Sequence, residues 1–188
     1  EGAAFPRGAL AVMIRPMNRR LFLHAGAAAA MAAAYAHRVH AAPEPAVSPD
    51  AVKALSGMAL PDLDGRTHKL SDWRGRPMVV NFWATWCAPC VKEMPELEAM
   101  QKSHPKVQFI GIGVDNADNI RKFLAKVPVS YPLVVMGANA IDTLRKLGNP
   151  AGGLPFTLVF NADGTVNRKI LGQIDAADLA HTVASLAG

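Results

Sequence analysis

Cysteine is scarce in this chain of 188 residues, which contains only two, Cys87 and Cys90. Two cysteines cannot form the set of disulfides that stabilises many small secreted domains. A single C-x-x-C pair also supplies only half of the ligands of a tetrahedral structural zinc site, so no metal site is predicted. The pair is therefore better interpreted as redox-active than as structural.

A large excess of one charge is also missing from most of the chain. The formal net charge is +5, but five arginines and a single acidic residue precede Ala42. Residues 42–188 carry 15 basic and 14 acidic residues, with no basic run and no basic patch with interleaved aromatic residues. The composition therefore predicts no nucleic-acid partner, neither DNA nor RNA.

The N-terminal region lacks the run of about 20 strongly apolar residues that a membrane-spanning helix needs. Residues 1–16 begin without Met and show no periodicity, so we interpret them as upstream sequence or a cloning remnant. In residues 17–41, Arg19-Arg20 and then Leu21-Phe22-Leu23 precede an uncharged, alanine-rich run. This segment resembles a twin-arginine export signal.

A general secretory signal is the alternative reading of residues 17–41, and both readings predict a periplasmic protein. Cleavage after Ala41 or after Ala36 would fit the small-residue pattern of signal processing. A cleaved signal is favoured over a permanent N-terminal membrane anchor because the apolar run is short and mostly alanine. The proline-rich residues 42–52 are then predicted to be an extended linker.

Residues 53–188 are predicted to form one α/β domain with a central mixed β-sheet flanked by helices. The turn at Asp64-Gly65 indicates an N-terminal β-hairpin. Expected strands cover 78–83, 107–114, 133–136, 156–160 and 166–171, and expected helices cover 91–103, 119–127, 140–147 and a final segment that starts after Asp175.

The cysteine pair lies where an apolar strand gives way to a helix. A helix N-terminus stabilises a thiolate and lowers its pKa, so Cys87 is the predicted nucleophile. Cys90 lies one turn later on the same side and is the predicted resolving thiol. Pro89 suits the first helical turn because its missing N–H would have had no partner there.

The segment Trp86-Cys87-Ala88-Pro89-Cys90, preceded by Asn81-Phe82-Trp83, resembles the active site of the thioredoxin superfamily. Glu93-Met94-Pro95 and the leading hairpin make it similar to the TlpA/ResA-like exported thioredoxins, with an insertion before the strand that follows a cis-proline. Trp86 is expected to shield the disulfide and to contact partners. The resemblance covers residues 58–186 and implies no cofactor.

The resemblance also implies a cis-proline opposite the cysteines, and Gly153-Leu154-Pro155 matches that position. A cis X-Pro bond exposes the Leu154 backbone for pairing with an extended substrate. The family usually continues with Thr-Thr, whereas this chain has Phe156-Thr157.

Asn81 stands where cytosolic thioredoxins have a buried Asp, and an amide cannot accept the proton of Cys90. Glu93, three residues after Cys90 on the same helix, is the predicted proton acceptor, because partial burial would raise its pKa. The alternative for Glu93 is a solvated helix carboxylate.

These features predict a periplasmic thiol:disulfide oxidoreductase that reduces protein disulfides and is itself reduced by a membrane thiol relay. The resemblance suggests cysteines of apocytochrome c or of copper sites as substrates. Alternatives are a disulfide-forming oxidant or isomerase, a thiol peroxidase, and a Cu(I) chaperone that uses both cysteines as soft ligands. The absence of a histidine between the cysteines favours the reducing direction.

Overall fold

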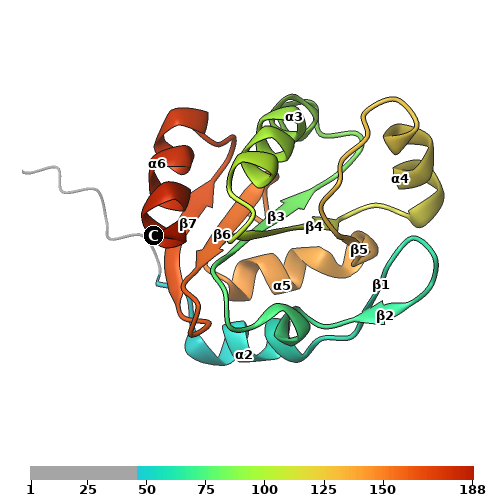
Figure 1. Cartoon of the computed structure of the whole chain (residues 1–188). Helices are drawn as coiled ribbons and strands as arrows, with labels where there is room; N and C mark the ends of the chain where they lie inside the picture. Colours follow the sequence, from blue (N-terminus) through green and yellow to red (C-terminus); the bar gives the residue numbers. More distant parts are fainter. Residues whose placement is uncertain (1–45) are drawn as a thin grey trace, which may run out of the picture. The chain divides into compact units, whose positions relative to one another are not determined.

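The computed structural model describes residues 46–188, so the predicted upstream segment and export signal lie outside the described residues. Its centre is a mixed sheet with the strand order β5-β4-β3-β6-β7 (Figure 1). β4 and β5 run parallel to β3, whereas β6 is antiparallel to β3 and β7 to β6. The predicted α/β fold with a mixed sheet is confirmed. The strands are β3 (Met78–Trp83), β4 (Gln108–Gly113), β5 (Leu133–Val135), β6 (Phe156–Phe160) and β7 (Val166–Leu171).

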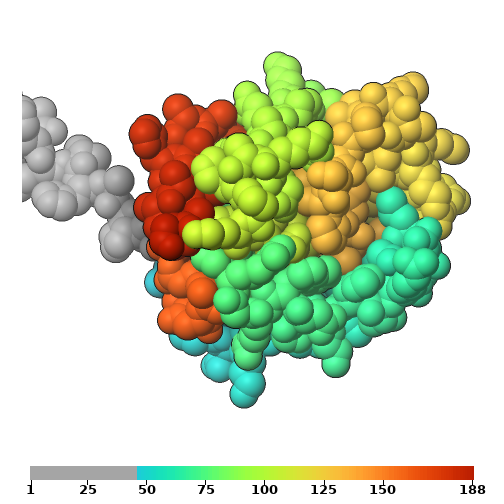
Figure 2. All heavy atoms as spheres, in the orientation of Figure 1, coloured from blue at the N-terminus to red at the C-terminus, as the bar shows by residue number. Residues whose placement is uncertain are grey.

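Helices cover both faces of the sheet, which explains why every residue of β3, β4 and β6 is buried. On one face, α3 (Ala88–Ser103) and α6 (Ala176–Ala187) pack on Val79 and Val159. The atoms of α3 and α6 lie directly against each other in the space-filling view (Figure 2). α2 (Pro49–Gly57) and α5 (Ala140–Lys146) cover the other face (Figure 1).

The predicted hairpin is present but short. β1 (Leu60–Pro61) pairs antiparallel with β2 (Thr67–His68), and Gly65 has a φ of 84° in the turn between them. An isolated bridge from Asp62 to Val134 attaches this hairpin to β5. A 3-10 helix, η1 (Leu70–Trp73), follows and leads into β3.

The folded region begins before residue 53. The prediction of an extended linker over residues 42–52 is therefore wrong for residues 49–52, which are helical. α2 starts at Pro49, because proline is well suited to the first helical turn and Asp50 lies favourably in that turn. Leu55 of α2 is completely buried in the core, which ties this helix to the domain. No helix within residues 46–188 is long and apolar enough to cross a membrane.

Two further segments complete the fold near the C-terminal ends of the parallel strands. α4 (Ala117–Leu124) follows β4, and Gly113 allows the Ile120 side chain to approach the strand where a Cβ atom would collide with it. The connection from β5 to β6 contains η2 (Gly137–Asn139) and α5 and ends at Leu154-Pro155.

Candidate active site

Cys87 and Cys90 form a disulfide at the junction of β3 and α3. Cys87 is the N-cap residue of α3, and its Sγ accepts a hydrogen bond from the Cys90 backbone N–H at 3.3 Å. Cys87 is 6% exposed and Cys90 is completely buried. Cys87 is thus the more accessible residue of the two. Its sulfur accepts a hydrogen bond from a backbone N–H at the helix N-terminus, which would favour a thiolate after reduction.

Trp86 precedes the cysteine pair and Pro89 lies between the two cysteines, as in the sequence Trp86-Cys87-Ala88-Pro89-Cys90. Trp86 is 68% exposed, an unusual exposure for so large an apolar side chain. Pro89 lies in the first turn of α3 and is half-buried. The Trp86 ring is therefore available for contact with a partner beside the disulfide.

The cis peptide bond expected before Pro155 is present. Because Phe156 of β6 pairs with Phe82 of β3, Pro155 lies beside the end of β3 from which the cysteine loop departs. The Pro155 carbonyl accepts a hydrogen bond from Gly172, but within residues 46–188 the Leu154 backbone makes no hydrogen bond. The Leu154 backbone is thus free to pair with an extended chain.

Glu93 is completely buried and fully hydrogen-bonded, rather than partly buried as expected. Its Oε1 accepts a hydrogen bond from Asn81 Nδ2 at 2.7 Å, and its Oε2 accepts one from the Ile174 backbone N–H at 3.0 Å. Burial raises the pKa of Glu93, although these two hydrogen bonds oppose the increase. The alternative of a solvated helix carboxylate is therefore wrong.

Asn81 connects Glu93 to the strand that follows the cis-proline. Its register partner on β6 is Thr157, and Asn81 Nδ2 donates a second hydrogen bond to Thr157 Oγ1 at 3.0 Å. Asn81 Oδ1 is buried and has no hydrogen-bond partner within residues 46–188. The amide therefore directs its donor group at the Glu93 carboxylate, the arrangement that suits an ionised acid.

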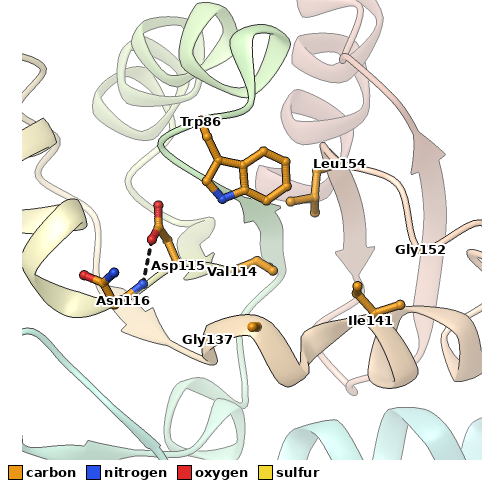
Figure 3. A pocket seen from close by; sticks show the side chains of 9 residues that line it. Trp86, Val114, Asp115, Asn116, Gly137, Ile141, Gly152 and Leu154 are labelled. Carbon is orange, nitrogen blue, oxygen red and sulfur yellow. Dashed lines mark hydrogen bonds between the residues drawn. The ribbon is translucent and has the colours of Figure 1, made fainter.

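A pocket of about 360 Å³ lies beside Trp86, and we call it the Trp86 pocket. Figure 3 shows Trp86 and Leu154 close together, with Ile141 of α5 and Gly137 of η2 across the hollow from them. Ile141 is 44% exposed, so the pocket presents apolar side chains to solvent. Other lining residues are Val114, Asp115, Asn116, Ala138 and Gly152.

Asp115 is the acidic residue of the Trp86 pocket and follows β4 closely. Its Oδ1 accepts hydrogen bonds from the Asn116 N–H at 2.7 Å and from Asn119 Nδ2 at 2.9 Å, and its Oδ2 accepts one from the Thr85 hydroxyl. Burial would raise the pKa of Asp115, but these hydrogen bonds outweigh it and hold the pKa below its ordinary value. Asp115 is therefore an anion at neutral pH.

The structure brings together the residues predicted for this site and adds four that sequence reasoning missed. Thr157 and Ile174 hold Asn81 and Glu93 through contacts that span 76 and 81 residues along the chain, so no local pattern could reveal them. Asp115 had a usable signal, because the C-terminal ends of the parallel strands β3 and β4 lie at the same edge of the sheet. Ile141 had none.

Residues 42–186, most of the chain, match the Redoxin family. The chain belongs to this family. The Redoxin-family chain is 32% identical over 130 residues to the thiol-disulfide oxidoreductase ResA of Geobacillus thermodenitrificans (strain NG80-2), an alignment that covers 68% of this chain and 72% of that protein.

Solved structures agree with this assignment. The thioredoxin-related protein from Neisseria meningitidis serogroup B is 36% identical with a TM-score of 0.59, over 68% of this chain and 97% of that one. A thiol:disulfide interchange protein of the thioredoxin family from Chlorobium tepidum TLS is 27% identical with a TM-score of 0.61, over 80% and 100% of the two chains. The predicted thioredoxin-like fold and the ResA-like resemblance are confirmed, and the Redoxin-family chain is a thiol-disulfide oxidoreductase.

Proposed function

We propose that this oxidoreductase works as a reductant of disulfides in specific proteins outside the cytoplasm. The observation that carries the proposal is the Cys87–Cys90 disulfide at the start of α3, beside the cis peptide Leu154–Pro155 with its unpaired Leu154 backbone. A substrate segment that pairs with Leu154 would present its own disulfide to Cys87.

The reaction begins with both cysteines reduced. The Cys87 thiolate attacks one sulfur of the substrate disulfide, forms a mixed disulfide and releases the other substrate sulfur as a thiolate that takes up a proton. Cys90 then loses its proton and attacks the Cys87 sulfur, which releases the second substrate thiol and leaves the Cys87–Cys90 disulfide. Two electrons pass from the enzyme to the substrate.

Glu93 is the proposed acceptor of the Cys90 proton. It lies three residues after Cys90, so the two side chains share one side of α3. Its burial supports the role, because a carboxyl with a raised pKa accepts a thiol proton more readily than a solvated one does. The hydrogen bonds from Asn81 and Ile174 hold the carboxylate in place.

Export and substrate class are further parts of the proposal. The arginine pair and the alanine-rich run of residues 17–41 support export by the twin-arginine or the general secretory route. In an oxidising compartment the Cys87–Cys90 disulfide must be reduced again by a membrane thiol relay. Cysteines of apocytochrome c or of copper sites are the proposed substrates, in keeping with the ResA-like sequence.

The reaction is tested with purified, fully reduced protein and a disulfide-bonded protein substrate. The native protein, with both Cys87 and Cys90, is expected to give two substrate thiols for each Cys87–Cys90 disulfide formed. Cys90→Ala is expected to stop at a covalent complex through Cys87, and Cys87→Ala to give neither product. The proposal fails if the protein instead oxidises reduced substrate dithiols and has no measurable reductase activity.

A further inference from the structure

Asp115 has no cationic partner among residues 46–188. Its hydrogen-bond donors are the Thr85 hydroxyl, the Asn119 side-chain amide and backbone N–H groups, all of which are neutral. Among the ion pairs of residues 46–188, none includes Asp115. The residue is 9% exposed, and hydrogen bonds at the start of α4, rather than a cation, stabilise its charge, so the carboxylate can still attract a cation of a binding partner.

This anion lies at the place where a substrate would bind. Asp115, Trp86 and Leu154 line the same pocket, and Asp115 and Leu154 lie on opposite sides of Trp86 (Figure 3). The rest of the lining that projects into the hollow is mostly apolar, including Ile141 and Val114. An extended chain paired with the Leu154 backbone would therefore place a residue next to its reactive cysteine near the Asp115 carboxylate.

We propose that Asp115 is a specificity-determining residue, which selects protein substrates that carry Lys or Arg close to the reactive cysteine. The inference rests on the proposed reductase function and names the substrate chemistry of the same site. Charge complementarity supports it: the long apolar stem of Lys or Arg would lie against Trp86 and Ile141 while its cation approaches Asp115. An acidic residue at the same place would be repelled.

The low polarity of the pocket strengthens this selection. Charges that interact beside apolar walls attract or repel each other more strongly than the same charges in water. An acid-to-amide change isolates the charge, since Asn in place of Asp115 retains the Oδ1 acceptor. Its Nδ2 can donate to the Thr85 hydroxyl, which serves as either donor or acceptor. Asp115→Asn should therefore fold normally.

Three short peptides provide the test. They are identical except for Lys, Gln or Glu beside a single cysteine, which carries thionitrobenzoate in a mixed disulfide. Cys87 of the reduced protein attacks the peptide sulfur, and the released thionitrobenzoate is measured by absorbance in a single turnover. Each rate is divided by the rate at which 2-mercaptoethanol attacks the same peptide, which removes differences in intrinsic reactivity.

The native protein is expected to react about tenfold faster with the Lys peptide than with the Glu peptide at low salt, and less selectively at high salt. In Asp115→Asn the ratio should fall to about two, while the Gln peptide keeps its rate within about twofold. Asp118→Asn removes an exposed carboxylate from α4 and should leave the ratio unchanged.

A Lys-to-Glu ratio that is the same in the native protein and in Asp115→Asn would overturn the inference and leave the reductase function intact. A uniform change of all three rates would also overturn it, because that result means Asp115 acts only on the reactivity of Cys87. If no peptide releases thionitrobenzoate, the proposed function and this inference both fail.

Discussion

Asn81 and Glu93 are joined by a buried hydrogen bond of 2.7 Å from Nδ2 to Oε1, which links the central strand to the helix that carries both cysteines. The partner of the Glu93 carboxylate in this contact is a neutral amide. Glu93 is a buried carboxyl group on the helix that begins at the cysteines. Asn81 has an amide at the position where cytosolic thioredoxins have a buried aspartate. In the proposed mechanism, Glu93 is therefore the acceptor of the Cys90 proton.

Glu93→Gln should slow resolution of the mixed disulfide by about 100-fold, because general acid–base groups typically contribute that much or more. The first attack by Cys87 should change by less than about threefold, since Glu93 acts on Cys90. Rapid-quench measurement of both steps checks this prediction. Glu96→Gln, an exposed carboxylate on the same helix, is the matched control. Equal slowing in both variants would rule out a specific role for Glu93.

The stability of the oxidised protein should contain a contribution from Glu93 that falls as pH rises. Burial raises the pKa of Glu93 above its ordinary value of 4.5, so the folded state holds the proton more tightly than the unfolded chain. This contribution is complete below pH 4.5 and is lost as pH rises through the folded pKa. Urea unfolding from pH 4 to pH 8 measures it.

Glu93→Gln is the reference for that measurement. The free energy of unfolding of Glu93→Gln minus that of the native protein should increase with pH, because only the native protein loses the contribution. Asp115 and other carboxyls with lowered pKa values act in the opposite direction, but they are present in both proteins and cancel. A difference that is constant or decreases with pH would contradict the raised pKa.

Asn81→Asp should destabilise the folded protein at pH 8 by about 2 kcal/mol or more, because it places a second buried carboxyl against Glu93. The loss should shrink at pH 5, because protonation of either acid at lower pH removes the repulsion between them. Thr157→Val, which removes only the other hydrogen bond of Asn81, should cost about 1 kcal/mol with no such pH dependence. Chemical unfolding of the native protein and both variants at pH 8 and pH 5 measures these differences in the free energy of unfolding.

Trp86→Ala should weaken reduction of protein disulfides about tenfold, mainly through KM, because an exposed aromatic ring beside the nucleophile provides contact area for a partner. The rate with a small disulfide should stay within about twofold. Stability should change by less than about 0.5 kcal/mol, since the ring is 68% exposed. Equal losses with both substrates would show that Trp86 affects the cysteines rather than substrate binding.

Local spacing predicted most of the fold and the centre of the site. The apolar run of β3, the C-x-x-C pair at a helix start and the position of Glu93 one turn later depend only on neighbours in sequence. The missing parts depend on contacts between distant segments. Strand register brings Thr157 to Asn81, and the loop before α6 brings the Ile174 N–H to Glu93.

Composition was a poor guide to the start of the domain. The prolines of residues 42–52 are typical of an extended linker, but Pro49 begins a helix whose Leu55 enters the core. The depth of burial of Glu93 also required the structure, since Leu97 and Met94 show only that this side of α3 faces inward.

Trapping in the native host tests whether the protein reduces disulfides of other proteins through Cys87. Cys90→Ala is produced from the full chain, and covalent complexes are isolated from the extracytoplasmic fraction and identified by mass spectrometry before and after reduction. We expect a small set of cysteine-containing proteins bound to Cys87 by bonds that a reductant breaks, and none with Cys87→Ala/Cys90→Ala. If no such complex forms although the variant is folded and abundant, the protein is not a reductant of protein disulfides.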